Sequence, residues 1–179
     1  MTVFISGGGK SGKSSLAQNL AVAMSKGGRR YYVATMIPVD EEDNERIRRH
    51  IADRAGMGFE TLEQGRDILA CLSAPVGVFL VDSATALLQN ALFPPEKNYE
   101  MDLEAAKRCG EELAEFARKA ENAIIVSDYI YDDPKRYDPA TEAYRACLGE
   151  NDRKLAQVCD TVVEMCAGRP TVYKGALPV

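Results

Sequence analysis

The sequence predicts an α/β protein in which helices cover both faces of a mostly parallel β-sheet, giving three layers. Short apolar runs rich in β-branched residues alternate along the chain with longer segments of helical spacing. Strands that are joined through helices pair in parallel, because the crossover brings the chain back to the same end of the sheet. The 179 residues suffice for one domain with its own core, and no internal repeat divides them. We therefore expect residues 1–179 to form a single domain.

The apolar runs give the positions of the strands. Four runs have the short, continuous apolar character of buried strands: Thr2–Ser6, Tyr31–Thr35, Gly77–Asp82 and Ala123–Ser127. Near the end of the sequence, Thr161–Cys166 and Thr171–Lys174 flank the turn sequence Gly168-Arg169-Pro170. That arrangement predicts a C-terminal β-hairpin.

Helical spacing of apolar residues predicts the elements between the strands. Pro94-Pro95 ends one of these helices, because proline disfavours the helical conformation of the residue before it. The segment 128–145 is rich in Tyr, Asp and Pro, which predicts a loop that leads into the last helix. The expected helices lie near residues 13–26, 41–55, 64–73, 84–93, 101–120 and 139–158.

Composition argues against several classes of protein. The formal net charge of −5 argues against a general binder of nucleic acid or of anionic membranes. No apolar run approaches the length of a membrane span. Five cysteines without a CxxC pair, together with one histidine, argue against a structural zinc site. No secretion signal follows Met1, so we expect a cytoplasmic protein with reduced, mostly buried thiols.

The segment GGGKSGKSS at residues 7–15 matches the pattern G-x-x-x-x-G-K-[ST] in full. Its glycines let successive backbone N–H groups turn toward phosphate oxygens, and the helix that follows adds the positive end of its dipole. A chance glycine-rich turn is the alternative, but it does not account for the strand before and the helix after. We therefore predict a nucleoside triphosphate site. Its phosphate-binding residues are Gly7, Gly8, Gly9, Lys10, Ser11, Gly12, Lys13, Ser14 and Ser15.

Two side chains of this loop and one strand end are the expected catalytic and metal-binding groups. Lys13 is expected to reach the terminal phosphates, and the Ser14 hydroxyl is expected to ligate Mg²⁺. Asp82 ends the apolar run GVFLVD and is the expected second metal ligand, since such acids lie at the carboxyl edge of the sheet. The alternative is that Asp82 caps the following helix, for which Ser83 is the rival cap. Asp128, which follows AIIVS, is a second candidate acid.

The only histidine, His50, lies in an arginine-rich helical segment. Arg46, His50 and Arg54 follow one another at steps of four residues, and Arg49 lies alongside. Residues at this spacing share one face of a helix. This face therefore carries three guanidinium groups around one imidazole.

Two interpretations of this face remain open. In the first, it is a solvated charged surface that nearby acidic residues stabilise. In the second, the arginines bind phosphate oxygens by paired hydrogen bonds, and the imidazole attacks phosphorus in the neutral form that surrounding positive charge favours. Ile47 and Ile51 supply an adjacent stripe that is expected to dock on the sheet.

Six segments, in order, carry a resemblance over nearly the whole chain. They are GGGKSGKS, YYVAT at 31–35, RIRRHIADR at 46–54, FETLE at 59–63, FLVDSATALLQNALF at 79–93 and ENDRKLAQVCDTVVEMCAG at 150–168. The sequence resembles the bifunctional adenosylcobinamide kinase/adenosylcobinamide-phosphate guanylyltransferase family. The loop motif is shared by many proteins, whereas its combination with the histidine helix is far more specific.

The resemblance implies a two-step enzyme of cobalamin biosynthesis. A nucleoside triphosphate, ATP or GTP, phosphorylates the hydroxyl of the aminopropanol arm of adenosylcobinamide, and GTP then donates GMP through a guanylyl-histidine intermediate. The family's nucleophile falls on His50, its phosphate loop on residues 7–15 and its acidic strand end on Asp82. The resemblance also implies a RecA-like P-loop NTPase fold and a propeller-like homotrimer.

The same resemblance gives the arginines a role, because Arg46, Arg49 and Arg54 would offset charge that grows on the α-phosphate oxygens. The implied partners are ATP, GTP and a corrinoid, with Mg²⁺ as the metal. Neither nucleic acid nor a membrane is expected to bind.

The sequence departs from the family pattern after Ser127, where DYIYDDPKRYDP replaces an Asn-Glu pair and a glycine-rich turn. Phe59 also stands where the family commonly has Trp. Two alternatives therefore stay open: a divergent P-loop kinase of another small hydroxylated molecule, and a nucleotide-dependent switch without transfer chemistry. Against the switch stands the absence of an N-K-x-D guanine-reading motif.

Overall fold

The computed structural model describes residues 1–131 and 133–178. Its strands are Thr2–Gly7 (β1), Arg30–Ala34 (β2), Glu60–Glu63 (β3), Val78–Asp82 (β4), Asn122–Asp128 (β5), Thr161–Cys166 (β6) and Arg169–Lys174 (β7). They form one sheet in the order β3-β2-β4-β5-β1-β6-β7. Over the described ranges, neighbouring strands are parallel except β6 and β7, which form an antiparallel hairpin. The predicted α/β class, parallel sheet and C-terminal hairpin are confirmed.

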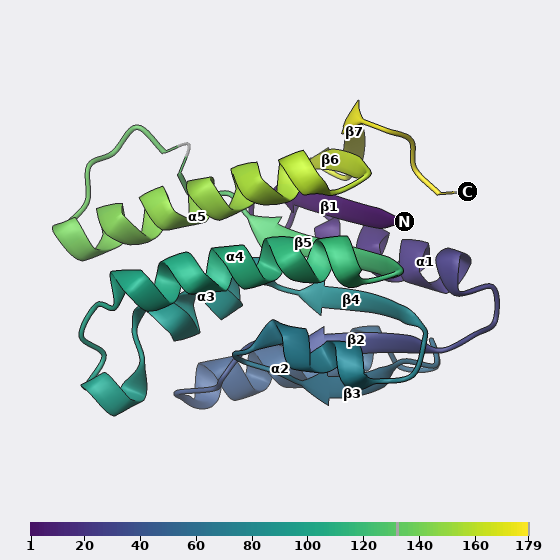
Figure 1. Cartoon of the computed structure of the whole chain (residues 1–179), viewed down its shortest axis with the longest axis horizontal. Coiled ribbons are helices and arrows are strands. Elements are labelled where there is room, and N and C mark those ends of the chain that lie inside the picture. The colour runs from purple at the N-terminus through teal and green to yellow at the C-terminus, as the bar shows by residue number, and fades with distance from the viewer. Residues whose placement is uncertain (132, 179) are drawn as a thin grey trace.

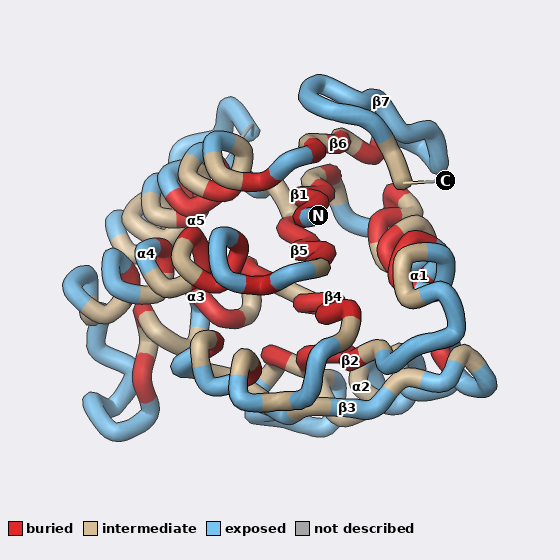
Figure 2. Tube along the Cα trace, turned by 45° about the vertical axis from the view of Figure 1, so that its right-hand side comes forward, coloured by how far each residue is buried: buried red, intermediate tan, exposed pale blue. Residues whose placement is uncertain are grey.

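Helices cover both faces of this sheet (Figure 1). The α-helices are Lys13–Ser25 (α1), Glu41–Asp53 (α2), Ala84–Leu92 (α3), Leu103–Lys119 (α4) and Pro139–Val158 (α5), and the 3₁₀ helices are Ile68–Ser73 (η1) and Pro95–Lys97 (η2). Helix α1 packs on one face, whereas α3, α4, α5 and η1 pack on the other. Figure 2 shows the central strands as buried segments between these two layers.

The alternation of side chains along β1 determines which layer each one reaches. Val3 and Ile5 pack with α1, whereas Phe4 packs into the layer of α4 and α5. Because successive strand side chains point to opposite faces, Ser6 lies on the same face as Phe4. Gly7 then ends the strand at the carboxyl edge of the sheet, where ligands of parallel α/β sheets bind.

Helix α2 lies at the periphery and has no buried residue (Figure 2). The expectation that Ile51 docks on the sheet is wrong, since Ile51 is 51% exposed, whereas Ile47 is half-buried. The helix begins at a strong local signal instead. The Asp40 side chain accepts a hydrogen bond from the Asp43 backbone N–H, and acidic residues fill the first turn.

The segment between β2 and β4 differs from the expectation. Residues 64–73 do not form one helix, because only the 3₁₀ helix Ile68–Ser73 is present, and it follows Asp67 in the left-handed conformation at φ 50°. The preceding strand, Glu60–Glu63, was not expected. It lies at an edge of the sheet with mostly exposed side chains, so it lacks the apolar run that marks a buried strand.

Three smaller expectations were also tested. Strand β7 begins at Arg169, two positions before the expected start. All five cysteines are free, but the expectation of mostly buried thiols holds only for Cys71 and Cys159, and Cys166 is exposed. Within residues 1–131 and 133–178, no helix has both the length and the apolar character that a bilayer span requires.

Candidate functional site

The predicted phosphate-binding segment, residues 7–15, covers the end of β1, the turn that follows and the start of α1. Gly7 is required there because a Cβ would lie 2.5 Å from the carbonyl oxygen of Met165 in the neighbouring strand β6. Gly12, the N-cap of α1, has a φ of 96°, a conformation that glycine adopts readily. No side chain caps this helix, and no acid lies in its first turn. The first N–H groups of α1 therefore suit an anion.

Lys13 is held inside this turn and is only 6% exposed. Its Nζ donates a hydrogen bond to the carbonyl oxygen of Gly8 at 2.7 Å and lies 2.6 Å from Oδ1 of Asp128. Asp128 ends β5, and the strand register places it opposite Gly7. The second candidate acid of the sequence is thus the carboxylate that contacts the lysine of the phosphate-binding segment.

The other residues of the segment surround the same turn. Ser14 lies in the first turn of α1. The carbonyl oxygen of Ser11 accepts a hydrogen bond from the backbone N–H of Gly168 at 3.0 Å, so the β6–β7 turn supports the segment. Lys10 is exposed, with φ 59°. Gly9 and Ser15 are exposed as well, whereas Gly8 is half-buried.

Asp82 ends β4 at the same edge of the sheet. Ser83, not Asp82, caps helix α3, since its side-chain oxygen accepts a hydrogen bond from the backbone N–H of Ala86 at 3.3 Å. Oδ2 of Asp82 instead accepts a hydrogen bond from the Tyr32 hydroxyl at 3.0 Å. Burial and the neighbouring Asp82 charge raise the pKa of Tyr32, so its hydroxyl stays protonated and can donate. The helix-cap alternative for Asp82 is therefore excluded.

The fold brings His50 to this strand end. The imidazole lies in the last turn of α2, and its Nδ1 is 3.8 Å from Oδ2 of Asp82. In the described structure Nδ1 is buried and has no hydrogen-bond partner, although the side chain as a whole is 33% exposed. The peripheral helix α2 thus places its one imidazole beside the predicted metal-ligand carboxylate.

The arginines near His50 do not converge on it as one cluster. Arg46 lies 3.4 Å from Glu42 and 3.8 Å from Asp43, both on its own helix. Nε of Arg49 donates a weak hydrogen bond to the carbonyl oxygen of Glu45 at 3.4 Å. Ion pairs this exposed contribute little to stability. Both guanidinium groups therefore stay available to an anion.

Arg54 has a different environment, because its side chain is buried. Its guanidinium carbon lies 3.9 Å from the ring centroid of Tyr32, and it donates a hydrogen bond to the Thr61 hydroxyl at 3.2 Å. Tyr32 therefore joins Arg54 to Asp82. Tyr32 was not among the residues predicted from the sequence. The one signal that could have indicated it is a hydroxyl-bearing side chain near the end of a buried strand.

Two hydroxyl side chains that contact the strand ends were also missed, Thr35 just after β2 and Thr85 in the first turn of α3. Thr35 is fully buried and exchanges two hydrogen bonds with the Ser83 backbone, donating to its carbonyl oxygen at 2.9 Å and accepting from its N–H at 2.6 Å. Thr85 accepts a hydrogen bond from the backbone N–H of Asp128 at 2.8 Å. These contacts fix the strand ends that carry Asp82 and Asp128.

The predicted residues thus form two groups at one edge of the sheet. Lys13 and Asp128 meet in the phosphate-binding segment, and His50, Asp82 and Arg54 lie around Tyr32. In the described residues, no hydrogen bond or ion pair joins His50 to the phosphate-binding segment.

Three comparisons with known proteins bear on this site. The family model described as cobinamide kinase / cobinamide phosphate guanyltransferase matches residues 3–173. No curated protein matches the sequence. Among solved structures, the flagellar accessory protein FlaH from Methanocaldococcus jannaschii is similar, with a TM-score of 0.43 and 13% sequence identity over 99% of this chain and 79% of that chain. Because the family model spans nearly the whole sequence, the chain belongs to the cobinamide kinase / cobinamide phosphate guanyltransferase family, whose reactions serve cobalamin biosynthesis.

Proposed function

We propose that the chain catalyses both reactions of its family. In the first, a nucleoside triphosphate phosphorylates the hydroxyl on the aminopropanol arm of adenosylcobinamide. In the second, GTP donates GMP to adenosylcobinamide phosphate through a guanylyl group on His50, releasing pyrophosphate and giving adenosylcobinamide-GDP. The main support is the position of His50, whose Nδ1 lies 3.8 Å from Asp82 at the ligand-binding edge of the sheet.

The phosphate-binding segment supports the use of a nucleoside triphosphate. Lys13 contacts Asp128 in this structure, so phosphate binding exchanges that carboxylate for a phosphate oxygen. We propose that the Ser14 hydroxyl and Asp82 hold Mg²⁺, since both offer the hard oxygen atoms that this ion prefers. No group of three or more His, Cys, Asp or Glu side chains in the described ranges forms a metal cage. A site with few protein ligands suits Mg²⁺, which offsets phosphate charge in such enzymes.

The guanylyl step is a pair of displacements at phosphorus. Asp82 lies 3.8 Å from Nδ1 of His50, so its negative charge favours the tautomer with the proton on Nδ1, which leaves the lone pair of Nε2 as the nucleophile. Nε2 forms a bond to the α-phosphorus of GTP while the bond to pyrophosphate breaks. A phosphate oxygen of adenosylcobinamide phosphate then attacks the same phosphorus, and the imidazole leaves. Arg46 and Arg49 are exposed and can offset charge on the α-phosphate oxygens.

Arg54 has a supporting position in this proposal. Its contact with Tyr32 holds the hydroxyl that donates to Asp82, and Asp82 faces His50. ATP, GTP and a corrinoid are the proposed partners.

The test is covalent labelling with GTP that carries ³²P at the α-phosphate. The wild-type chain is expected to retain label that is stable in base and lost in acid, as a phosphoramidate on imidazole requires. GTP labelled at the γ-phosphate should leave none of this adduct. His50→Ala should abolish the label, whereas the matched control Arg48→Ala on the exposed side of α2 should keep it. An unlabelled wild-type chain, or equal label on His50→Ala, would contradict the mechanism.

A further inference from the structure

The hydroxyl of Tyr32 is linked to His50 through a single carboxylate oxygen. Tyr32 lies on β2 and is only 4% exposed, and its hydroxyl donates a hydrogen bond to Oδ2 of Asp82 at 3.0 Å. The same Oδ2 atom lies 3.8 Å from Nδ1 of His50. The oxygen nearest to the imidazole is therefore the one that the tyrosine holds.

The tyrosine ring is itself held by two neighbours. The guanidinium carbon of Arg54 lies 3.9 Å from the ring centroid, and the ring of Phe59 meets it edge-on, with the centroids 6.3 Å apart. Both geometries are favourable for an aromatic ring. Arg54 is 8% exposed and also donates to the Thr61 hydroxyl of β3 at 3.2 Å. The end of α2 and strand β3, which lie beside β2 in Figures 1 and 2, thus fix the position of the hydroxyl.

The hydroxyl determines which way the carboxylate of Asp82 points. An aspartate side chain can rotate about two bonds, and a charge-assisted hydrogen bond to one oxygen holds it in one orientation. In that orientation Oδ2 lies toward Nδ1 of His50, about 1 Å beyond hydrogen-bonding distance. Nδ1 is buried and has no other partner in the described structure. A small shift of α2, which has no buried residue, is enough to close this contact.

The same contacts separate Arg54 from the other arginines near His50. Its guanidinium is buried against Tyr32, whereas Arg46 and Arg49 are exposed. Direct binding to a phosphate would require Arg54 to leave both the ring and the Thr61 hydroxyl. Any effect of Arg54 on the reaction therefore passes through Tyr32.

We propose that Tyr32 is a positioning residue of the guanylyl step, in which its hydroxyl holds Asp82 toward His50 and Arg54 holds the Tyr32 ring. This inference rests on the guanylyl transfer proposed above. Tyr32 touches no reacting atom, and no bond to it forms or breaks. Loss of its hydroxyl therefore slows the attack of His50 on the α-phosphorus and leaves the binding of GTP unchanged.

The first measurement is the rate of covalent labelling by GTP that carries ³²P at the α-phosphate, over GTP concentrations that also give its Kd. Tyr32→Phe removes the hydroxyl and keeps the ring. It should lower the rate at saturating GTP about tenfold, as expected for loss of a hydrogen bond to a charged group, and keep the Kd within about twofold of the wild type. Tyr99→Phe, which removes the hydroxyl of an exposed tyrosine, is the matched control and should change neither value.

A double-mutant cycle tests the part of Arg54. Arg54→Lys keeps the positive charge but loses the planar group that lies over the ring, so it should slow labelling about threefold. Because Arg54 acts through Tyr32, adding Arg54→Lys to Tyr32→Phe should cause no further loss. If the two losses multiply instead, Arg54 acts on the nucleotide directly and its proposed role is wrong.

The only histidine of the chain also gives a spectroscopic signal of its own. The imidazole ¹⁵N signals are recorded in nucleotide-free protein that carries no histidine tag, at one fixed pH. Tyr32→Phe should shift these signals, because Asp82 is then no longer held toward His50. Tyr99→Phe should leave them in place. This comparison requires no turnover, and a loss of labelling that came only from a weakened fold would not reproduce it.

Several results would overturn the inference. If the wild type and Tyr32→Phe take up label at equal rates, Tyr32 positions nothing while the proposed function stands. The same conclusion follows if the rate falls but the His50 signals do not move, or if the Kd for GTP rises as much as the rate falls. If the wild type takes up no label, the guanylyl step itself fails, and the role of Tyr32 in it fails too.

Discussion

At the scale of single residues, Asp152 gives the clearest pH dependence. Burial is the main cause that raises its pKa to about 6, the hydroxyls of Ser127 and Tyr131 lower it, and the charge of Asp128 raises it. The folded state binds this proton more tightly than the unfolded state does. Above its folded pKa the carboxyl is ionised, and the buried charge then destabilises the fold. It lowers the free energy of unfolding as the pH rises from about 4 to about 6.

We therefore expect Asp152→Asn to match the wild type in stability near pH 4 and to exceed it at pH 7. A pKa raised by roughly 2 units corresponds to a gain of roughly 3 kcal/mol in the free energy of unfolding at pH 7. Urea denaturation of both proteins between pH 4 and pH 7.5 measures the difference at each pH. A difference that stays constant over this range would show that Asp152 titrates as an ordinary exposed carboxyl.

At the scale of elements, Arg145 organises the loop between β5 and α5. Its buried guanidinium donates to the carbonyl oxygens of Ile130 at 3.2 Å, Tyr131 at 3.1 Å and Lys135 at 2.9 Å, and also to that of Asp133. One side chain of α5 thus satisfies the backbone of a segment that has no strand or helix of its own. The planar guanidinium group can donate several hydrogen bonds in different directions at once, whereas lysine carries a single compact ammonium group.

Arg145→Lys should loosen this loop and lower the free energy of unfolding by about 2 kcal/mol, because several charge-assisted hydrogen bonds are lost together. Limited trypsin digestion followed by mass spectrometry should detect faster cleavage after Lys135 and Arg136. Arg118→Lys, an exposed change at the end of α4, serves as the control and should digest like the wild type. Equal cleavage rates in all three proteins would mean that the loop does not depend on Arg145.

The sequence predicted the elements whose signals are local. Buried strands such as β4 have apolar runs, and α1 follows a motif that defines its first turn. Strand β3 escaped prediction because it is an exposed edge strand, stabilised by pairing with β2 rather than by an apolar run. The helix expected at 64–73 failed because Asp67 adopts a left-handed conformation that interrupts it.

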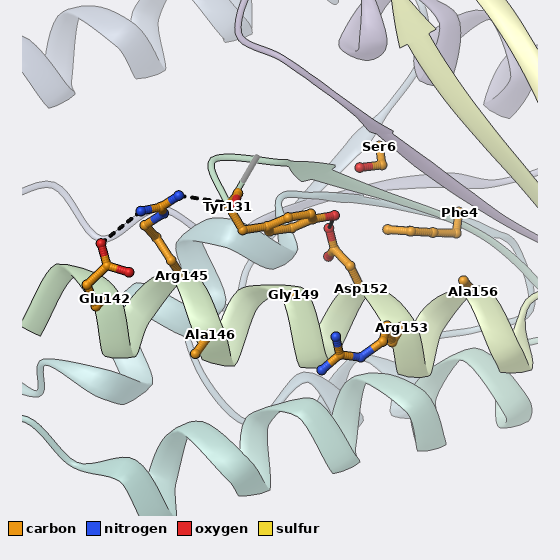
Figure 3. Close-up of a pocket in the computed structure, with 10 residues that line it drawn as sticks. All are labelled: Phe4, Ser6, Tyr131, Glu142, Arg145, Ala146, Gly149, Asp152, Arg153 and Ala156. Atoms are coloured by element: carbon orange, nitrogen blue, oxygen red, sulfur yellow. Dashed lines mark hydrogen bonds and ion pairs between the residues drawn. The ribbon is translucent and has the colours of Figure 1, made fainter. Parts of the chain in front are cut away.

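At the scale of the whole molecule, the sequence indicated candidate residues for the site but not the contacts between them. The motif identified Lys13, but only the order of the strands places Asp128 beside it. The meeting of His50 with Asp82 likewise depends on how α2 lies against the end of β4, which helical spacing does not determine. A cavity lined by Asp152 of α5 has no motif in the sequence, because its walls come from β1, α5 and the loop between β5 and α5 (Figure 3).

The peripheral position of α2 bears on assembly. None of its residues is buried. Ile51 of α2 is 51% exposed, and Val39, just before the helix, is 69% exposed. A helix that carries a proposed nucleophile yet packs weakly on its own subunit is well placed for contact with another copy. Together with the family resemblance, this exposure leads us to propose a homotrimer in which α2 meets the neighbouring subunit.

Light scattering coupled to size-exclusion chromatography should give a mass three times the 19.6 kDa of one chain. Ile51→Glu introduces a charge into the proposed interface, so it should weaken association at least tenfold, because a buried charge without a partner is strongly unfavourable. Val76→Glu is the matched control, since Val76 is 76% exposed in the segment before β4 and should tolerate the charge. A trimer that persists in Ile51→Glu would place the interface elsewhere. A monomeric wild type would show instead that α2 stays exposed to solvent and that one chain contains the whole site.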